Sequence, residues 1–227
     1  MGESDASKPG VEPTWRHAMS RVVGSLPLVE RAYATIRFSI LRPKLLSILD
    51  LLLPIEGRIL DVGCGFGLFA GYFGQTAPER SIVGIDPDAR RVAIARGVAA
   101  RVGLSRHEFH VGDIRTTTIP GPFDGIYILD VMHHIAAADQ EHVLETLYDR
   151  LVSGGRLVMK DVTTVPRAGL LFTEILDRLM VGMNEELAYR HHHEWERMLR
   201  RIGFRVRTVR VPDVLPYPHV VISAEKR

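Results

Sequence analysis

The clearest chemical pattern in the sequence is a run of glycines beside an acidic residue in ILDVGCGFGLFA, residues 59–70. Two apolar residues lead into Asp61, and Gly63, Gly65 and Gly67 then follow at alternate positions. Glycines at this spacing after a strand let the main chain turn sharply or let a ligand approach it closely. The stretch therefore predicts a cofactor loop between a strand and a helix.

Two classes of cofactor compete for this loop. A dinucleotide-binding fold places its third glycine three residues after the second, to seat a pyrophosphate, whereas the spacing here is G-x-G-x-G and position 68 is leucine. A carboxylate such as Asp61 is unfavourable beside a pyrophosphate and favourable beside an ammonium group. S-adenosylmethionine carries an ammonium group and no phosphate, so the loop favours S-adenosylmethionine over NAD.

Strand and helix patterns alternate around the loop. The hydrophobic periodicity predicts strands in RILDVG, SIVGID, HEFHVGD, FDGIYILD and GRLVMKDV, and helices over residues 66–75, 87–102 and 139–151. Strands that alternate with helices form a parallel sheet covered on both faces. The chain is therefore expected to be an α/β protein.

The two ends of the chain depart from this alternation. The sequence predicts a flexible tail over 1–13, a helical cap over 14–53 that is broken at Arg42–Pro43, and one domain over 54–227 with an insert at about 166–193. Near the C-terminus it predicts helices over 168–183 and 192–202, and an antiparallel pair of strands over 204–211 and 219–227.

These residues resemble the class I S-adenosylmethionine-dependent methyltransferases that act on small molecules. LDVGCGFG is similar to the first motif of that family, and VGIDPD is similar to the acidic end of its second strand. GDI, FDGIYILDVMHHI and LVSGGRLVMKDV follow in the expected order. The resemblance covers residues from about 43 to 162 and implies a Rossmann-like, mainly parallel seven-stranded sheet whose last strand is antiparallel.

The resemblance also implies a set of cofactor contacts. Asp86 would accept both ribose hydroxyls, and Asp113 would accept from the adenine amino group. Without the resemblance, the simplest interpretation of Asp86 is a helix cap, that of Asp113 a turn residue and that of Cys64 a small packing residue. The expected cofactor-binding residues are Asp61, Gly63, Cys64, Gly65, Gly67, Asp86, Pro87, Asp113, Ile114, Leu129 and Asp130.

Methyl transfer requires alignment, desolvation and removal of a proton from the acceptor. His133 and His134 follow the fourth expected strand and are candidates for the base, the alternative being that they pack the local turn. No metal is expected, although Asp130 and these histidines could be drawn as ligands. The run over residues 191–193 is also not expected to bind metal, because three consecutive helical histidines cannot all face one point.

The acceptor is expected to be a small apolar or amphipathic molecule and the reaction an O-methylation. The basis is two apolar segments predicted to cover the site, RAYATIRFSILRP and AGLLFTEILDRLMVGM. The candidate lid and acceptor residues are Tyr33, Arg37, Arg42, Phe172 and His191. The alternatives are an inactive methyltransferase-like binding module and, less favoured, an NAD-dependent oxidoreductase.

Composition limits the setting in which the chain works. A net charge of +2 gives no reason to expect a nucleic-acid partner, and Cys64 as the single cysteine excludes an internal disulfide framework. We find no leader and no apolar stretch long enough to span a bilayer, so we expect a cytoplasmic protein. Residues 14–49 carry six Arg and Lys residues against one acid. The simplest interpretation is a solvated basic face, and a weak peripheral contact with an anionic membrane is the alternative.

Overall fold

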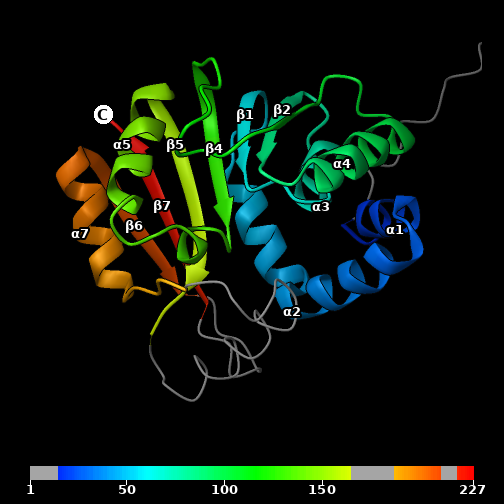
Figure 1. Ribbon diagram of the computed structural model, residues 1–227, viewed down its shortest axis with the longest axis horizontal. Helices are drawn as coiled ribbons and strands as arrows, with labels where there is room; N and C mark the ends of the chain where they lie inside the picture. Colours follow the sequence, from blue (N-terminus) through cyan, green and yellow to red (C-terminus); the bar gives the residue numbers. More distant parts are fainter. Residues whose placement is uncertain (1–14, 165–186, 211–218) are drawn as a thin grey trace, which may run out of the picture.

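The computed structural model describes residues 15–164, 187–210 and 219–227. A seven-stranded sheet lies at its centre, with helices on both faces (Figure 1). The strands are β1 (Gly57–Val62), β2 (Arg80–Asp86), β3 (Glu108–Val111), β4 (Phe123–Leu129), β5 (Leu151–Val162), β6 (Phe204–Arg210) and β7 (His219–Lys226). The helices are α1 (Trp15–Ser25), α2 (Leu28–Leu52), α3 (Leu68–Thr76), α4 (Ala89–Val102), α5 (Gln140–Arg150) and α7 (His192–Ile202), with a short 3-10 helix η1 (Met132–His134).

The sheet has the strand order β3-β2-β1-β4-β5-β7-β6. β1 to β5 pair in parallel, whereas β7 runs antiparallel to both β5 and β6. This confirms the predicted Rossmann-like, mainly parallel sheet with an antiparallel last strand. The strand order reverses between β1 and β4, and ligands bind at such a switch point, outside the carboxyl ends of the strands.

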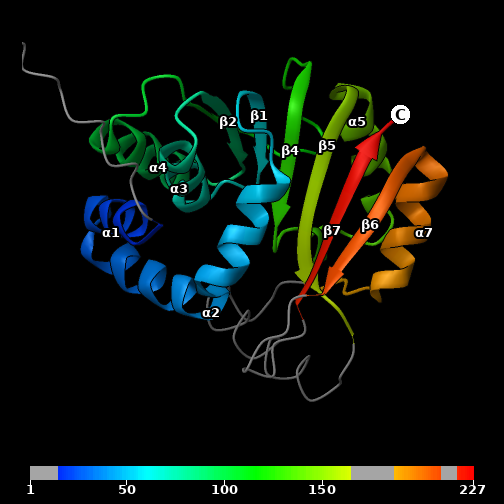
Figure 2. The same cartoon turned by 180° about the vertical axis from the view of Figure 1, so that it is seen from behind.

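The two faces of the sheet carry separate apolar cores. Neighbouring residues of a strand point to opposite faces, so Ile59 of β1 packs in the cluster beneath α1 to α4 and Leu60 packs in the cluster beneath α5 and α7. Both views place α7 beside β6 and α1 at the other end of the molecule (Figures 1 and 2). The sheet is therefore buried on both faces, and its carboxyl edge is the place where loops can build a site.

The N-terminal helices are bound to the sheet by a buried arginine. α2 bends at Arg42, which has a φ of 50° and a ψ of 150° and precedes Pro43, so the predicted break lies at the expected step. Beyond the bend, Arg80 of β2 is only 1% exposed. Its guanidinium donates to Asp50 Oδ1 at 2.5 Å and to the Pro54 carbonyl at 2.6 Å. The end of α2 is thereby attached to the sheet.

Some predicted boundaries differ from those of the structure. α4 begins at Ala89 and not at 87, because the side chain of Asp88 caps it by accepting from the backbone N–H of Arg90 and Arg91. β5 begins at Leu151, whereas the prediction started it at Gly155. The predicted tail over 1–13 and helix over 168–183 lie outside the described residues, and the domain boundaries remain a prediction.

Candidate cofactor-binding and catalytic site

The glycine loop joins β1 to α3 and lies against the end of β2. The backbone N–H groups of Gly63 and Cys64 both donate to the carbonyl of Ile85, at 2.8 and 3.0 Å. Gly63, Gly65 and Gly67 have φ values of 74°, 50° and 74°. Residues with a Cβ rarely adopt such values, so the sequence uses glycine at the three positions where the chain must turn this way.

The surroundings of these glycines differ. A Cβ at Gly63 would meet the side chain of Val131, and one at Gly67 would meet Ala95 at 2.9 Å. Within the described residues, nothing lies within 4 Å of the position that a Cβ would take at Gly65. Gly63 and Gly67 therefore permit close packing within the chain, whereas Gly65 borders open space where a ligand could approach the backbone.

Asp86 ends β2 beside this open part of the loop. Its Oδ2 accepts from the backbone N–H of Gly65 and its Oδ1 from that of Asp88, both at 2.9 Å. The alternative that Asp86 caps the following helix is wrong, since Asp88 fills that role. Pro87, between them, is exposed. The two backbone bonds fix the carboxylate and leave lone pairs for further donors.

Asp113 and Ile114 lie one strand further out, after β3. The Asp113 carboxylate accepts from the backbone N–H of Arg115 at 2.9 Å and pairs with its guanidinium at 2.5 Å. The side-chain hydrogen bond from Arg115 holds the pKa of Asp113 below its ordinary value. Asp113 thus shapes a turn here, as the alternative interpretation expected, and Ile114 is buried beside it.

Asp61 is a buried carboxyl group at the end of β1. It is 2% exposed, and its Oδ2 makes no hydrogen bond of ordinary geometry within the described part of the chain. Burial raises the pKa of Asp61 to about 8, although the nearby Tyr127 hydroxyl opposes this shift. Cys64 is also buried, and burial raises the pKa of its thiol. The thiol therefore stays protonated, which fits packing and not nucleophilic attack.

One face of α2 approaches the glycine loop. Glu30, Tyr33 and Arg37 are three and four residues apart, so they share that face. Glu30 pairs with Arg90 of α4, and Tyr33 packs edge-on against Phe66 of the loop with ring centroids 5.6 Å apart. Arg37 reaches the end of β4. The candidate residues Tyr33 and Arg37 are thus brought to the site.

Asp130, directly after β4, lies between two buried cations. Its carboxylate pairs with Arg37 and, at 2.5 Å, with Lys160 Nζ of β5, and all three side chains are at least nine-tenths buried. Burial opposes ionisation, but Arg37 and Lys160 outweigh it and hold the pKa of Asp130 below its ordinary value. Leu129, just before it, is buried. A metal ion on Asp130 would have to displace these cations.

Lys160 was not among the residues predicted from the sequence. A lysine inside the buried run LVMKDV was the available signal, because a lysine is almost never buried unless it is paired.

His133 is held by a second buried acid, Asp161. His133 lies in η1 and is 1% exposed, and its Nδ1 is 2.5 Å from Asp161 Oδ1. The same oxygen accepts from the backbone N–H of Val162 at 2.7 Å. The ring of Tyr189 stacks on the imidazole of His133, with the two ring centroids 5.1 Å apart. Asp161 was also missed, although an acid in a buried strand is as unusual as a buried lysine. The pair is a His–carboxylate arrangement suited to accepting a proton.

The remaining candidates are spread around this edge. The ring centroids of His134 and His133 are 4.2 Å apart. Arg42 is exposed at the bend of α2. His191 immediately precedes α7. Phe172 lies outside the described residues.

Replacing Asp61 with asparagine should change how stability depends on pH. The pKa of Asp61 rises from an ordinary 3.8 to about 8 in the fold, so between these values the folded chain holds one more proton than the unfolded chain. The free energy of unfolding of the wild type therefore falls as pH rises through this window. Asp61 contributes up to about 1.4 kcal/mol per pH unit to this fall. Asn does not titrate, so urea denaturation should show that Asp61→Asn gains stability relative to wild type from about pH 5 to about pH 8. A stability difference between Asp61→Asn and wild type that does not change with pH would mean that Asp61 is already ionised in the folded chain.

Comparisons with known proteins agree with this geometry. Residues 59–155 match a family model described as a methyltransferase domain. The ubiquinone biosynthesis O-methyltransferase of Methylocella silvestris is 32% identical over 162 residues, which cover 64% of this chain and 54% of that protein. The chain spans from about a quarter to just over half of the length of the curated relatives it matches.

Two solved structures share the fold. The S-adenosylmethionine-dependent methyltransferase SibL in its apo form has a TM-score of 0.71 at 24% identity, covering 92% of this chain and 61% of SibL. Human N-acetylserotonin methyltransferase in complex with SAM has a TM-score of 0.65 at 20% identity, covering 94% of this chain and 56% of that one. Residues 59–155 therefore carry a methyltransferase domain, and the chain shares the fold of these two solved methyltransferases.

Proposed function

We propose that the chain transfers a methyl group from S-adenosylmethionine to a hydroxyl group of a small apolar or amphipathic acceptor. The observation that carries this proposal is the convergence of an open glycine loop, a fixed carboxylate at Asp86 and the His133–Asp161 pair at one edge of the sheet. An NAD-dependent enzyme is disfavoured because the buried carboxyl of Asp61, once ionised, would repel a pyrophosphate. An inactive module is disfavoured because the glycine loop and Asp86 keep a geometry suited to a cofactor.

The residues of the loop fit the donor. When bound, S-adenosylmethionine supplies an electrophilic methyl group on a sulfonium. In our proposal the open backbone at Gly65 lies against the donor, and Asp86 accepts from its ribose hydroxyls with its remaining lone pairs. Asp61 holds the ammonium group, since a nearby positive charge would lower the raised pKa and ionise the carboxyl. Asp113, Ile114 and Leu129 are proposed to contact the adenosine and sulfonium regions.

His133 is the proposed base. It takes the acceptor hydroxyl proton at Nε2 while its Nδ1 remains bound to Asp161, and the carboxylate stabilises the imidazolium that results. Asp161 is a positioning residue in this account, because it acts through the histidine. The structure gives His133 this carboxylate partner, and we therefore choose His133 over His134.

The acceptor class is argued from the surfaces that border the site. Tyr33 and Phe66 present aromatic rings beside the loop, and rings of this kind line pockets for apolar ligands. A relative that shares 32% identity is named for O-methylation in ubiquinone biosynthesis. We therefore propose a phenolic or quinol-like hydroxyl on an apolar body as the acceptor group.

His133→Ala should lower turnover by about 100-fold or more with little change in donor affinity, because the base is lost and the donor contacts remain. The assay incubates the chain with S-adenosylmethionine and a panel of phenols and quinols, and detects methylated product by mass spectrometry. Asp161→Asn should lower turnover and shift its pH profile, an effect that a purely structural residue would not produce.

His142→Ala is the matched control, since His142 is an exposed histidine on α5. It should leave turnover unchanged. Full turnover in His133→Ala with an intact circular dichroism spectrum, or a larger loss in His134→Ala, would show that His133 is not the base. Absence of methylated product from the whole panel would argue against this acceptor class.

We also propose that the N-terminal helices contact an anionic membrane when the acceptor is collected. No described helix is both long and apolar enough to cross a bilayer. Leu28 and Val29, at the start of α2, are 79% and 78% exposed, in a region that carries six Arg and Lys residues against one acid. Exposed apolar side chains beside basic ones are the features that hold a helix at an anionic interface.

Leu28→Ser combined with Val29→Ser should reduce sedimentation with vesicles of phosphatidylglycerol and phosphatidylcholine at low ionic strength. Leu51→Ser is the control, because Leu51 is 83% exposed at the other end of α2. Wild-type protein that stays in the supernatant with these vesicles would contradict the membrane proposal and leave the enzyme proposal intact.

A further inference from the structure

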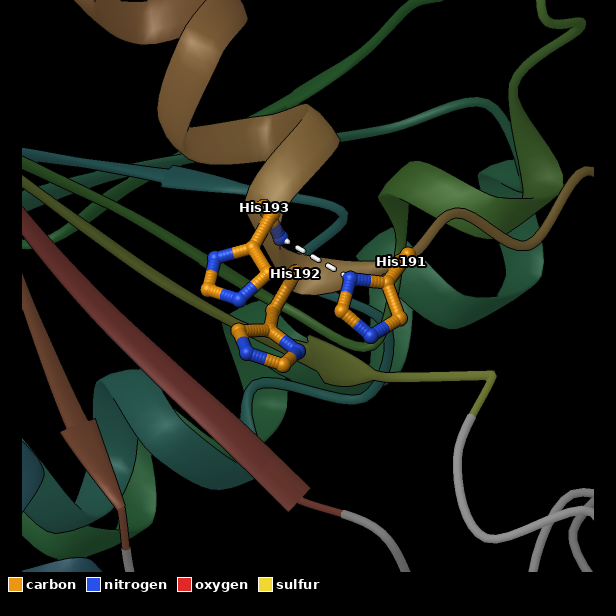
Figure 3. A group of neighbouring side chains, drawn as sticks. All are labelled: His191, His192 and His193. Atoms are coloured by element: carbon orange, nitrogen blue, oxygen red, sulfur yellow. Dashed lines mark hydrogen bonds between the residues drawn. The ribbon is translucent and has the colours of Figure 1, made fainter.

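Three consecutive histidines gather at the start of α7, at the same edge of the sheet as the candidate site. His191 precedes the helix, and His192 and His193 form its first two residues. One ligand atom from each lies within 4.8 Å of the others, and the ring centroids are 4.2 to 5.0 Å apart (Figure 3). The three rings therefore form one cluster.

The expectation that these three side chains cannot approach one point is wrong. It assumed that all three belong to one helix, but His191 has an extended backbone, with a φ of −68° and a ψ of 141°. Its Nδ1 accepts from the backbone N–H of His193 at 3.3 Å, which turns its ring back over the helix start (Figure 3).

We propose that His191, His192 and His193 bind a divalent transition-metal ion of the borderline class, such as Zn²⁺. Imidazole nitrogen is a preferred donor for zinc, copper and nickel, whereas calcium and magnesium prefer oxygen. Three protein nitrogens leave a further coordination position for water or another oxygen donor. Adjacent residues supply the donors, so the site requires no long-range closure of the chain.

Neighbouring groups orient two of the rings. His193 Nδ1 lies 3.6 Å from Glu196 Oε2, and His192 Nδ1 lies 3.2 Å from Thr163 Oγ1. Metal-binding histidines commonly use one nitrogen for the ion and the other for a carboxylate or hydroxyl partner, which fixes the ring. This arrangement assigns Nε2 of His192 and His193 to the metal.

The cluster is accessible from the side of His193, whereas His192 is 8% exposed. His193 is 62% exposed, and a surface hollow is lined by His191, His193, Glu194, Glu196, Arg197 and Arg200. The positive end of α7 disfavours a cation, and Glu194 in the first turn and Glu196 oppose that effect. Each of these acids also pairs with an arginine, Glu194 with Arg190 and Glu196 with Arg200. His191 accepts the backbone N–H of His193 at Nδ1, so the proton of its neutral ring is on Nε2. Metal binding at Nε2 moves this proton to Nδ1. The 3.3 Å hydrogen bond that caps the helix is then replaced by the bond to the metal.

The test is equilibrium dialysis of the full, tag-free chain against Zn²⁺, with metal content measured by mass spectrometry. We expect one tight equivalent per chain. His191→Asn retains a side chain that can cap the helix, and His193→Gln changes an exposed residue, so both should fold. Each should weaken zinc binding by roughly tenfold or more, because losing even a residue that only orients a ligand typically costs about 10- to 100-fold in metal affinity.

His142→Gln provides the control, as His142 is exposed on α5 and distant in sequence from the cluster. It should bind zinc as wild type does. Co²⁺ should give visible absorption bands typical of nitrogen ligation in wild type and lose them in His193→Gln. Absence of stoichiometric zinc binding, or equal zinc binding by His193→Gln and wild type, would overturn the proposal.

Discussion

The arrangement of the site depends on the ion pairs at Asp130. This carboxylate is bound by Arg37 from α2 and by Lys160 from β5, and its own backbone N–H donates to the Lys160 carbonyl at 2.8 Å. Such groups are expensive to bury, and removing one partner typically costs about 3–5 kcal/mol because it leaves an uncompensated charge. The three charges therefore fix α2 over the carboxyl edge of the sheet, and with it Tyr33 over the glycine loop.

Carboxyl groups along this edge have different protonation states because their surroundings differ. Burial raises the pKa of Asp61 to about 8, whereas Arg37 and Lys160 hold the pKa of Asp130 below its ordinary value and keep it ionised. Such pairs of acids with divergent pKa values mark the division of roles in many active sites. Here Asp61 is the neutral group, which in our proposal ionises when the ammonium of the donor binds, and Asp130 is the anion that holds α2 through Arg37.

The sequence predicted the sheet and the glycine loop well because both follow local rules. Alternating apolar runs and glycine spacing are visible in any short window, and Asp86 was proposed as a ribose-binding residue because VGIDPD is similar to the second motif of the family. Lys160 and Asp161 were missed because their partners, Asp130 and His133, are about 30 residues away, and only the pairing of β4 with β5 brings them together. The histidine cluster was misjudged because all three histidines were treated as helical, whereas His191 lies before the helix in an extended conformation.

The central claim is that the loop and Asp86 bind S-adenosylmethionine, and calorimetric titration tests it most directly. Wild-type chain should bind S-adenosylmethionine and not NAD. Asp86→Ala should lose roughly 2–4 kcal/mol of binding, about 30-fold to several hundredfold in affinity, while the neighbouring helix-cap variant Asp88→Ala should bind as wild type does. Equal affinity for S-adenosylmethionine in Asp86→Ala and wild type, or wild-type binding of NAD alone, would contradict the account.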